Sequence, residues 1–200
     1  FSFIICEDGS TDDTVEILNR LKLKYPIILL SHPTKKGYSN AVIDGIKHAT
    51  ADYLLVMDSD GQCDPKEIFK FWDNRKKADV INGNRVPRED FLYRRYFSNF
   101  AYFIYKLFFN VKLHDPSVAF TLMSKKVYSA LSNFKPQMPD GFFWEFNARA
   151  LRKGFTSLEV NIVHKKRKYG NTKIFHFYRL PKIAFINLKG LINVKFFSKD

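Results

Sequence analysis

The chain has 200 residues, of which 46% are hydrophobic and 16% aromatic, so it can bury a sizeable core and is not a disordered tail. Its two cysteines exclude a disulfide framework and a cysteine-rich metal site. The net charge of +13 is uneven, because residues 1–80 hold 11 basic and 13 acidic side chains and residues 81–200 hold 22 and 7. We therefore expect the second part to face nucleic acid, an anionic membrane surface or a phosphorylated ligand.

No run of about 18 uncharged apolar residues, the length needed to cross a membrane as a helix, occurs in the sequence. The nearest run, YFSNFAYFIYKLFF, is interrupted by Asn99 and Lys106. The opening run, FSFIIC, resembles a strand already in progress at the first residue. We therefore expect the chain to be a fragment that lacks its true N-terminus.

Short apolar runs alternate with helical patterns over the first eighty residues. The pattern predicts strands at 1–6, 27–32, 53–58 and 78–82, and helices within 9–25, 37–49 and 65–77. Ser10 or Thr11 is expected to cap the first helix, and Pro26 to end it. Strands joined by helices of about a dozen residues indicate crossover connections and a parallel sheet.

The second half is rich in aromatic and basic residues. Segments 91–113 and 178–199 have helical length, wide apolar faces of mainly Phe, Tyr and Ile, and Lys or Arg as their only charges. They could be buried amphipathic helices or helices that lie on a membrane interface, and the recurrence of this composition adds support to the second alternative while leaving both open. Without a repeat or a low-complexity linker, we predict one domain over residues 1–200.

The segment LLVMDSDGQCDP places two carboxylates on alternate residues just past a strand. Asp58 and Asp60, followed by Gly61 and Gln62, would offer the hard oxygen ligands that Mg²⁺ or Mn²⁺ prefers. The alternative is that the two aspartates cap the next helix. That helix already has its own cap signature in Asp64-Pro65.

A second acidic strand end, EDGSTDDT, lies at residues 7–14. Asp8 and the Gly9-Ser10 turn meet a helix start, where backbone N–H groups and a carboxylate could hold a ribose or a base. By itself this pattern is typical of a capped helix. Together with the paired aspartates two strands later, it predicts a ligand site at the carboxyl ends of the strands.

Three segments in order, EDGSTDDT, KKGYSNAVIDGIKHATADYLLVMDSDGQCDP and NGNR, resemble glycosyltransferase family 2, whose members transfer sugars from sugar nucleotides. The similarity is greatest to the branch of dolichol-phosphate mannose synthases and polyprenyl-phosphate glycosyltransferases, and it runs over nearly the whole chain. It implies the α/β GT-A fold, a Rossmann-like, mostly parallel sheet flanked by helices, here with basic aromatic amphipathic helices in the C-terminal half. The nucleotide and metal half would be about 1–85 and the acceptor half about 86–200.

The resemblance also implies roles for single residues in the first half. The Mg²⁺ or Mn²⁺ ligands would be Asp58, Asp60 and Gln62, with Asp60 acting in catalysis. Contacts to the nucleotide sugar would come from Asp8, Gly9, Ser10, Lys36 and Asp58.

In the second half, Arg85 matches an arginine that meets the acceptor phosphate, and Arg94 or Arg95 lies near a second one. The segment GFFWEFNARA would place Glu145 and Arg149 near the active site, and HKKRKYGNTK resembles a basic element that closes over the diphosphate. This similarity assigns phosphate contacts to Arg167 and Lys173, with Gly170 as a flexible turn.

The sequence departs from the family in two places. The Pro-x-Tyr-Asn-Glu segment of the family's first strand, which helps hold the nucleotide, is absent from this chain. In HDPSVAFTLMSKK, where the family often has Gly-Phe-Arg, this chain has Val118, Phe120 and Thr121.

The expected function is metal-dependent, inverting transfer of a sugar from a UDP- or GDP-sugar to a polyprenyl phosphate at the cytoplasmic face of a membrane. The protein would be peripheral, or anchored by segments outside this chain. A sugar hydroxyl as acceptor would instead need a carboxylate base, for which Asp140 and Glu145 are the candidates.

No Gln-x-x-Arg-Trp segment of a processive polysaccharide synthase occurs. Two further alternatives are a catalytically inactive scaffold and a basic nucleic-acid-binding domain, although no RNA-binding signature occurs and we expect no nucleic acid partner.

Overall fold

The structure, a computed structural model, describes residues 1–86, 102–110, 113–165 and 180–198. Its elements in chain order are β1 (Phe3–Asp8), α1 (Thr14–Lys22), β2 (Ile27–His32), α2 (Tyr38–Lys47), β3 (Tyr53–Met57), the 3₁₀ helix η1 (Pro65–Glu67), α3 (Ile68–Asn74), β4 (Val80–Arg85), a helix at 102–109, β5 (Phe120–Ser124), α5 (Lys125–Ala130), α6 (Phe142–Arg152), β6 (Ser157–Ile162) and α7 (Leu180–Phe196).

The first sheet is a parallel pair of β1 and β2, paired from Phe3 with Ile27 to Asp8 with His32. The crossover that a parallel pair requires is α1. The predicted bounds of the second strand are confirmed. The expected cap at Ser10 or Thr11 is wrong, because α1 begins at Thr14 with Asp13 in the cap position and the Ser10 N–H is already bonded to the Glu7 carboxylate.

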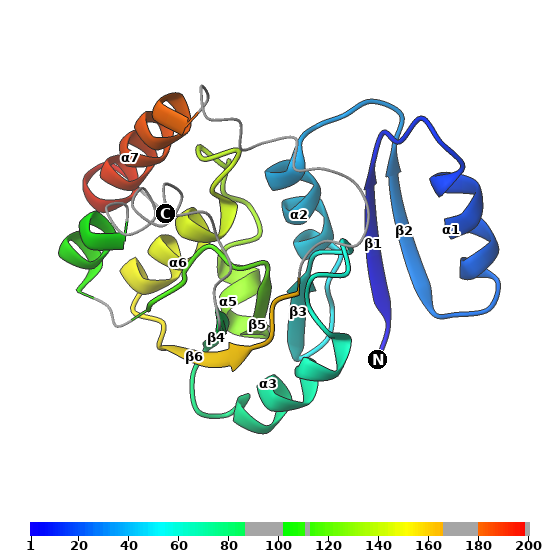
Figure 1. The fold of residues 1–200 in the computed structure, drawn as a ribbon, viewed down its shortest axis with the longest axis horizontal. Helices are drawn as coiled ribbons and strands as arrows, with labels where there is room; N and C mark the ends of the chain where they lie inside the picture. Colours follow the sequence, from blue (N-terminus) through cyan, green and yellow to red (C-terminus); the bar gives the residue numbers. More distant parts are fainter. Residues whose placement is uncertain (87–101, 111–112, 166–179, 199–200) are drawn as a thin grey trace.

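The second sheet has four strands in the order β3-β5-β4-β6. β4 and β6 are parallel, whereas β5 lies antiparallel between β3 and β4. The expectation of one sheet continuing from the first strands through β3 needs correction, because β1 pairs only with β2 and β3 only with β5 among the described strands. Figure 1 shows that β1 is the strand of the first sheet nearer to β3.

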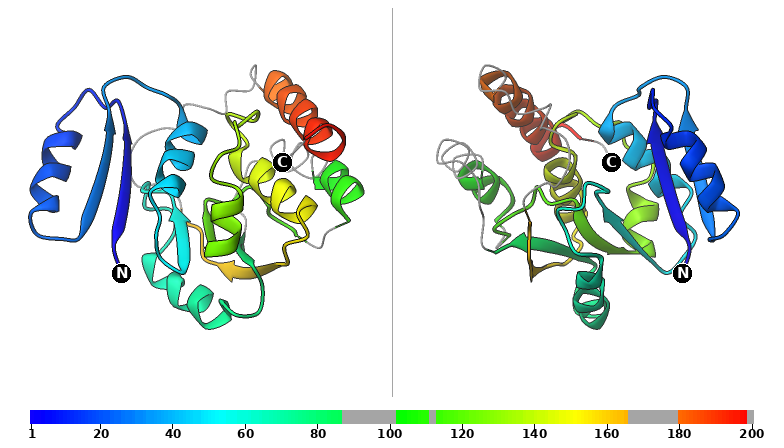
Figure 2. Two further views of the ribbon diagram at one scale, coloured as in Figure 1. Left: turned by 180° about the vertical axis from the view of Figure 1, so that it is seen from behind. Right: turned by 45° about the vertical axis from the view of Figure 1, so that its right-hand side comes forward.

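Helices cover both faces of the second sheet (Figures 1 and 2). On one face, α2, α5 and α6 bury Ile43, Ile46, Val127 and Phe146 against residues that include Val80 and Met123. On the other face, Phe71 of α3 packs on the alternate strand positions Ile81, Phe120, Leu122 and Ile162. Neighbouring residues of β4 and β5 thus point into different cores, as the alternation of side chains along a strand requires.

The helix at 102–109, α6 and α7 form a third core around Tyr105, Ala148, Leu191 and Val194. The first predicted aromatic segment, 91–113, is described as a helix only at 102–109, and the second is α7. α7 carries apolar side chains on its buried face and also exposes Phe185 and Phe196, so its apolar residues are less segregated than expected. Within the described ranges, no helix is long and apolar enough to span a membrane.

Helix α2 joins the two sheets. Its Ile43 and Ile46 are buried in the core of the second sheet, while Gly45 lies against Cys6 of β1. A Cβ atom at position 45 would lie 2.8 Å from the Cys6 Sγ atom, so a side chain here forces one of the two elements to move. Glycine is therefore required at this position by the close approach of α2 to β1.

We expect Gly45→Ala to lower the free energy of unfolding, because overpacking costs about 1–3 kcal/mol and the better helix propensity of alanine returns only about 1 kcal/mol. In a Cys6→Ala background the sulfur is gone and the added methyl group has room. Urea denaturation of the single and double variants should therefore give a coupling free energy of about 1 kcal/mol or more. Additive effects would show that α2 does not approach β1 this closely.

Candidate active site

Asp58 is held by groups from other elements, and Asp60 by its own turn. The Asp58 N–H donates to the Ala119 carbonyl oxygen at 3.2 Å, and the Tyr38 hydroxyl donates to Asp58 Oδ1 at 2.8 Å. Asp60 Oδ1 accepts the backbone N–H of Gln62 at 3.0 Å. The helix-cap alternative for these aspartates is wrong, because Asp64 caps η1 and accepts the Lys66 N–H at 3.0 Å.

Tyr38 is the first residue of α2 and was not singled out from the sequence. Burial raises the pKa of the Tyr38 hydroxyl, and the charge and hydrogen bond of Asp58 and the charge of Asp60 raise it further. The phenol therefore stays protonated at neutral pH and can donate to the carboxylate. The 2.8 Å hydrogen bond itself places the Asp58 carboxylate against this hydroxyl.

The turn after the aspartates pairs with the segment that follows β6. The Lys165 N–H donates to the Gln62 carbonyl oxygen at 2.8 Å, and the Gln62 Nε2 atom donates to the Lys165 carbonyl oxygen at 3.1 Å. The backbones of Cys63 and His164 form an isolated antiparallel β-bridge. In this structure the Gln62 side chain therefore holds residue 165. Its predicted role as a metal ligand stays a prediction.

Cys63 lies among the charged groups of the site. Burial and the charges of Asp60 and Asp58 raise the pKa of the Cys63 thiol to about 11, although Arg85 acts in the opposite direction. The thiol is therefore protonated at neutral pH and is not a nucleophile. Arg85 and both aspartates thus act electrostatically on one side chain.

The donor set suits a divalent cation that is shared with a ligand. The described residues contain no cluster of three or more His, Cys, Asp or Glu side chains that could hold a metal by themselves. Two carboxylates are nevertheless what Mg²⁺ commonly takes from a protein when phosphates and water complete its shell. Asp58 and Asp60 therefore fit a cation whose binding depends on a diphosphate.

Asp8 at the end of β1 clamps the loop before α2. Its carboxylate accepts the N–H of Lys36 at 2.7 Å and of Gly37 at 2.9 Å. Gly9 has a φ of 71°, and a Cβ atom there would lie 2.9 Å from the backbone nitrogen of Lys35, so only glycine fits. Lys36 itself pairs with Asp44, with Nζ 3.4 Å from Oδ2.

Glu7, the residue before Asp8, holds the Gly9-Ser10 turn by hydrogen bonds. The sequence did not single it out, because Glu7 looks like an ordinary strand residue. Its carboxylate accepts the backbone N–H of Ser10 and, at 2.8 Å, the hydroxyl of Ser31. These hydrogen bonds, that of Ser10 first, lower the pKa of Glu7. Ser10 is therefore fixed in place, and its predicted contact with the nucleotide sugar stays a prediction.

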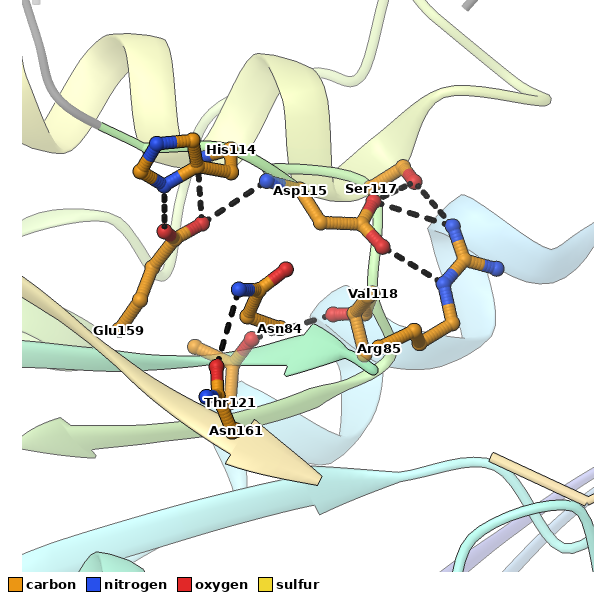
Figure 3. A network of polar contacts seen from close by, with 9 residues as sticks. All are labelled: Asn84, Arg85, His114, Asp115, Ser117, Val118, Thr121, Glu159 and Asn161. Carbon is orange, nitrogen blue, oxygen red and sulfur yellow. Dashed lines mark hydrogen bonds and ion pairs between the residues drawn. The ribbon is translucent and has the colours of Figure 1, made fainter. Parts of the chain in front are cut away.

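Arg85 at the end of β4 forms a two-pronged ion pair with Asp115 (Figure 3). The Nε and Nη2 atoms donate to Asp115 at 2.6 and 3.0 Å, and Nη2 also donates to the Ser117 hydroxyl at 3.1 Å. The Nη1 atom points away from Asp115 (Figure 3). Asp115 thus offsets part of the Arg85 charge and fixes the direction of its guanidinium group.

Glu159 of β6 anchors the loop that carries Asp115. Its Oε1 atom accepts the N–H of His114 at 2.6 Å and of Asp115 at 2.8 Å, and its Oε2 atom lies 2.8 Å from His114 Nδ1. Nearby, the Thr121 hydroxyl donates to the Val118 carbonyl oxygen at 3.2 Å (Figure 3). All three residues that depart from the family pattern, Val118, Phe120 and Thr121, are buried.

Glu145 was a candidate base, and the structure argues against that role. Its side chain is 0% exposed. Its Oε1 atom accepts hydrogen bonds from Arg149 Nη2 at 2.8 Å and Nε at 3.0 Å. Its Oε2 atom accepts the backbone N–H of Gln137 at 2.7 Å and of Met138 at 2.9 Å. A base must reach the acceptor, whereas these oxygens are enclosed. Glu145 instead holds the loop that leads to Asp140.

Asp140 is exposed just before α6. The Ser39 hydroxyl of α2 donates to the carbonyl oxygens of Met138 and Pro139 at 3.3 and 3.0 Å, which ties this loop to the helix start that also holds Asp58. The structure therefore brings Asp58, Tyr38 and the loop that carries Asp140 into one region. The other predicted site residues, Arg94, Arg95, Arg167, Gly170 and Lys173, lie outside the described residues.

We expect Glu145→Ala to lower the free energy of unfolding by about 3–5 kcal/mol, because it removes the carboxylate that neutralises the buried Arg149 charge. Asp140→Asn is the matched control, since an exposed site away from the core should change it by less than about 0.5 kcal/mol. Urea denaturation measures both values. Equal small effects would show that Glu145 does not hold this loop.

Comparison with known proteins gives the family and the fold. A family model described as Glycosyl transferase family 2 matches residues 1–132. A dolichol-phosphate mannosyltransferase of Pyrococcus furiosus is 35% identical over 89 residues, 44% of this chain and 25% of that protein. An undecaprenyl-phosphate 4-deoxy-4-formamido-L-arabinose transferase of Pseudomonas aeruginosa is 22% identical over 182 residues, 86% of this chain and 50% of that protein. The chain thus spans half or less of the length of these relatives.

Among solved structures, glucosyl-3-phosphoglycerate synthase from Mycobacterium tuberculosis, in complex with Mn²⁺, UDP and phosphoglyceric acid, matches with a TM-score of 0.71 and 14% identity. The match covers 100% of this chain and 69% of that one. The α/β GT-A fold expected from the sequence is thereby confirmed. Since the family model matches well over half of its residues, the chain belongs to glycosyl transferase family 2.

Proposed function

We propose that this protein is a metal-dependent, inverting glycosyltransferase that moves a sugar from a nucleotide-sugar donor to a polyprenyl phosphate. The observation that carries the proposal is the pair Asp58 and Asp60. None of the helices in the described part of the chain uses this pair as a cap, and Asp58 is bonded to Tyr38 at the start of α2, next to the loop that Asp8 holds. The relatives from Pyrococcus and Pseudomonas, whose names specify polyprenyl phosphates, support the acceptor class.

The donor would lie across the ends of β1 and β3. Asp8, Gly9, Ser10 and Lys36 are the proposed contacts to the nucleotide sugar, and Asp58 and Asp60 the ligands of Mg²⁺ or Mn²⁺, the ions bound by the mycobacterial synthase. Such a cation, when bound, acts as a Lewis acid that offsets charge on the leaving diphosphate. Arg167 and Lys173 are proposed to add positive charge to the same diphosphate.

The reaction is an in-line displacement at the anomeric carbon. An oxygen of the acceptor phosphate forms the new bond to this carbon while the bond to the diphosphate breaks, and the diphosphate leaves with the electron pair. With a second pKa of about 6, a phosphate acceptor is mostly ionised at neutral pH and needs no strong base. Arg85, oriented by Asp115, is proposed to bind this phosphate together with Arg94 or Arg95.

A sugar hydroxyl as acceptor is the second candidate. It is favoured by one observation, the exposed Asp140 on a loop that Ser39 ties to the start of α2. A hydroxyl must lose its proton as it attacks, and Asp140 could accept that proton. The chemical nature of the product distinguishes the two acceptors.

Activity should be tested with the full-length protein in membranes, supplied with Mn²⁺ or Mg²⁺ and labelled UDP- and GDP-sugars. We expect a lipid-linked labelled product that disappears in Asp60→Ala and persists in Asp73→Ala, which removes an exposed aspartate on α3. Loss of the metal ligand should lower the rate by at least about 100-fold, because several kcal/mol of charge stabilisation are lost. Product found only in an aqueous polysaccharide fraction would contradict the lipid acceptor.

We further propose that the helix at 102–109 and α7 rest on the cytoplasmic face of a membrane. Phe103 and Leu107, four residues apart on one helix face, are 62% and 68% exposed. Four lysines on the two helices are exposed as well, namely Lys106, Lys182, Lys189 and Lys195. Exposed aromatic and aliphatic side chains among basic residues suit anionic lipid headgroups above an acyl layer.

Binding to vesicles that contain anionic lipid should fall at least about tenfold in the double variant Phe103→Ser, Leu107→Ser, since burial of each side chain contributes about 1.5–3 kcal/mol. Phe69→Ser is the matched control, because Phe69 is 67% exposed but lies on α3. Sedimentation with vesicles measures the bound fraction. Equal losses in both variants would place the lipid contact elsewhere.

A further inference from the structure

The Tyr38 hydroxyl is a neutral group that donates directly to the Asp58 side chain at 2.8 Å, and the chain fixes both partners of this hydrogen bond. On one side of Tyr38, the Gly37 N–H is held by Asp8 at 2.9 Å. On the other side, the Ser39 hydroxyl is bonded to Pro139 at 3.0 Å. The geometry from Tyr38 to Asp58 therefore depends on backbone that is already anchored at two points.

Asp58 is anchored in the same way. Its backbone N–H donates a hydrogen bond to the carbonyl oxygen of Ala119, the residue before β5, at 3.2 Å. Its Oδ1 atom accepts a hydrogen bond from the Tyr38 hydroxyl at 2.8 Å. One carboxylate oxygen is thus fixed by a donor that carries no charge. Hydrogen bonds of this kind orient metal-binding carboxylates. Removing such a hydrogen-bond partner typically lowers metal affinity by about 10- to 100-fold.

Tyr38 contributes little to the hydrophobic core. It is 40% exposed, and it belongs to none of the three core clusters formed by the described residues. A residue kept for packing alone would bury its ring, whereas Tyr38 directs its hydroxyl to the Asp58 carboxylate, two residues before the second carboxylate of the pair. Its position is therefore explained by Asp58 and Asp60 rather than by the core.

We infer that Tyr38 is a positioning residue for the cation site, which orients the Asp58 carboxylate and reduces its repulsion with Asp60 before a divalent cation binds. The inference rests on the proposed function, because it assumes that Asp58 and Asp60 hold the cation of a nucleotide diphosphate. It predicts that the hydroxyl, and not the ring, determines cation affinity. In structural terms, Asp8 holds the loop that carries Tyr38, and the Tyr38 hydroxyl orients the Asp58 carboxylate.

The test uses the full-length protein, Mn²⁺ and either UDP or GDP, with free Mn²⁺ measured by its electron paramagnetic resonance signal. We expect Tyr38→Phe to raise the Kd for Mn²⁺ by about 10- to 100-fold. The Mn²⁺ concentration that gives half-maximal transfer should rise by the same factor. Tyr128→Phe is the matched control, because it removes a tyrosine hydroxyl that donates to Ala51 just before the start of β3, and its Kd should stay within about threefold of wild type.

The outcomes separate the inference from the proposed function. If wild type fails to bind Mn²⁺ in the presence of UDP and also of GDP, the proposed metal site is contradicted, and the inference with it. The same holds if Asp60→Ala binds Mn²⁺ as well as wild type does. Wild type that binds and Asp60→Ala that does not, together with an unchanged or lower Kd in Tyr38→Phe, overturns the inference alone. Equal increases in Tyr38→Phe and Tyr128→Phe would also overturn it, since the loss would then reflect general destabilisation.

Discussion

The fold depends on helix α2, because it packs on both of the sheets that the described strands form. The two sheets have separate ladders, and β1 and β3 are not paired. Ile43 and Ile46 bury one side of α2 in the core of the second sheet, while Gly45 lets the helix approach Cys6 of β1. Packing on α2 therefore contributes to the position of the first sheet relative to the second, which makes the close approach at Gly45 a constraint on the site.

The start of α2 carries the polar counterpart of this packing. Asp8 holds the backbone of Lys36 and Gly37, Tyr38 reaches Asp58, and Ser39 holds the loop at Met138 and Pro139. Three parts of the candidate site thus meet within four consecutive residues. Because each contact is a hydrogen bond to a backbone group or a carboxylate, a shift of α2 would disturb the donor side and the Asp140 loop together.

The order of the first elements could be predicted from local pattern, and the site only in part. The bounds of the strand at 27–32 could be predicted because Pro26 lies directly before it and Pro33 directly after it. β5 was not predicted, because its partners β3 and β4 precede it by more than thirty residues and it runs antiparallel to both. The sequence makes Glu145 a candidate base for a hydroxyl acceptor, beside Asp140, because it does not show whether a carboxylate is exposed or, as here, enclosed by Arg149 and two backbone N–H groups.

The sequence by itself determined the family, the alternation of strands and helices in the first half, and the placement of Asp8, Asp58 and Asp60 at strand ends, because these features follow from residue order and local periodicity. Only the tertiary structure decided which groups those aspartates contact. Tyr38 lies twenty residues before Asp58, and Asp115 thirty residues after Arg85. Such pairs form where the packing of α2 and the insertion of β5 bring distant backbone together, and no local pattern records a contact that depends on the whole fold.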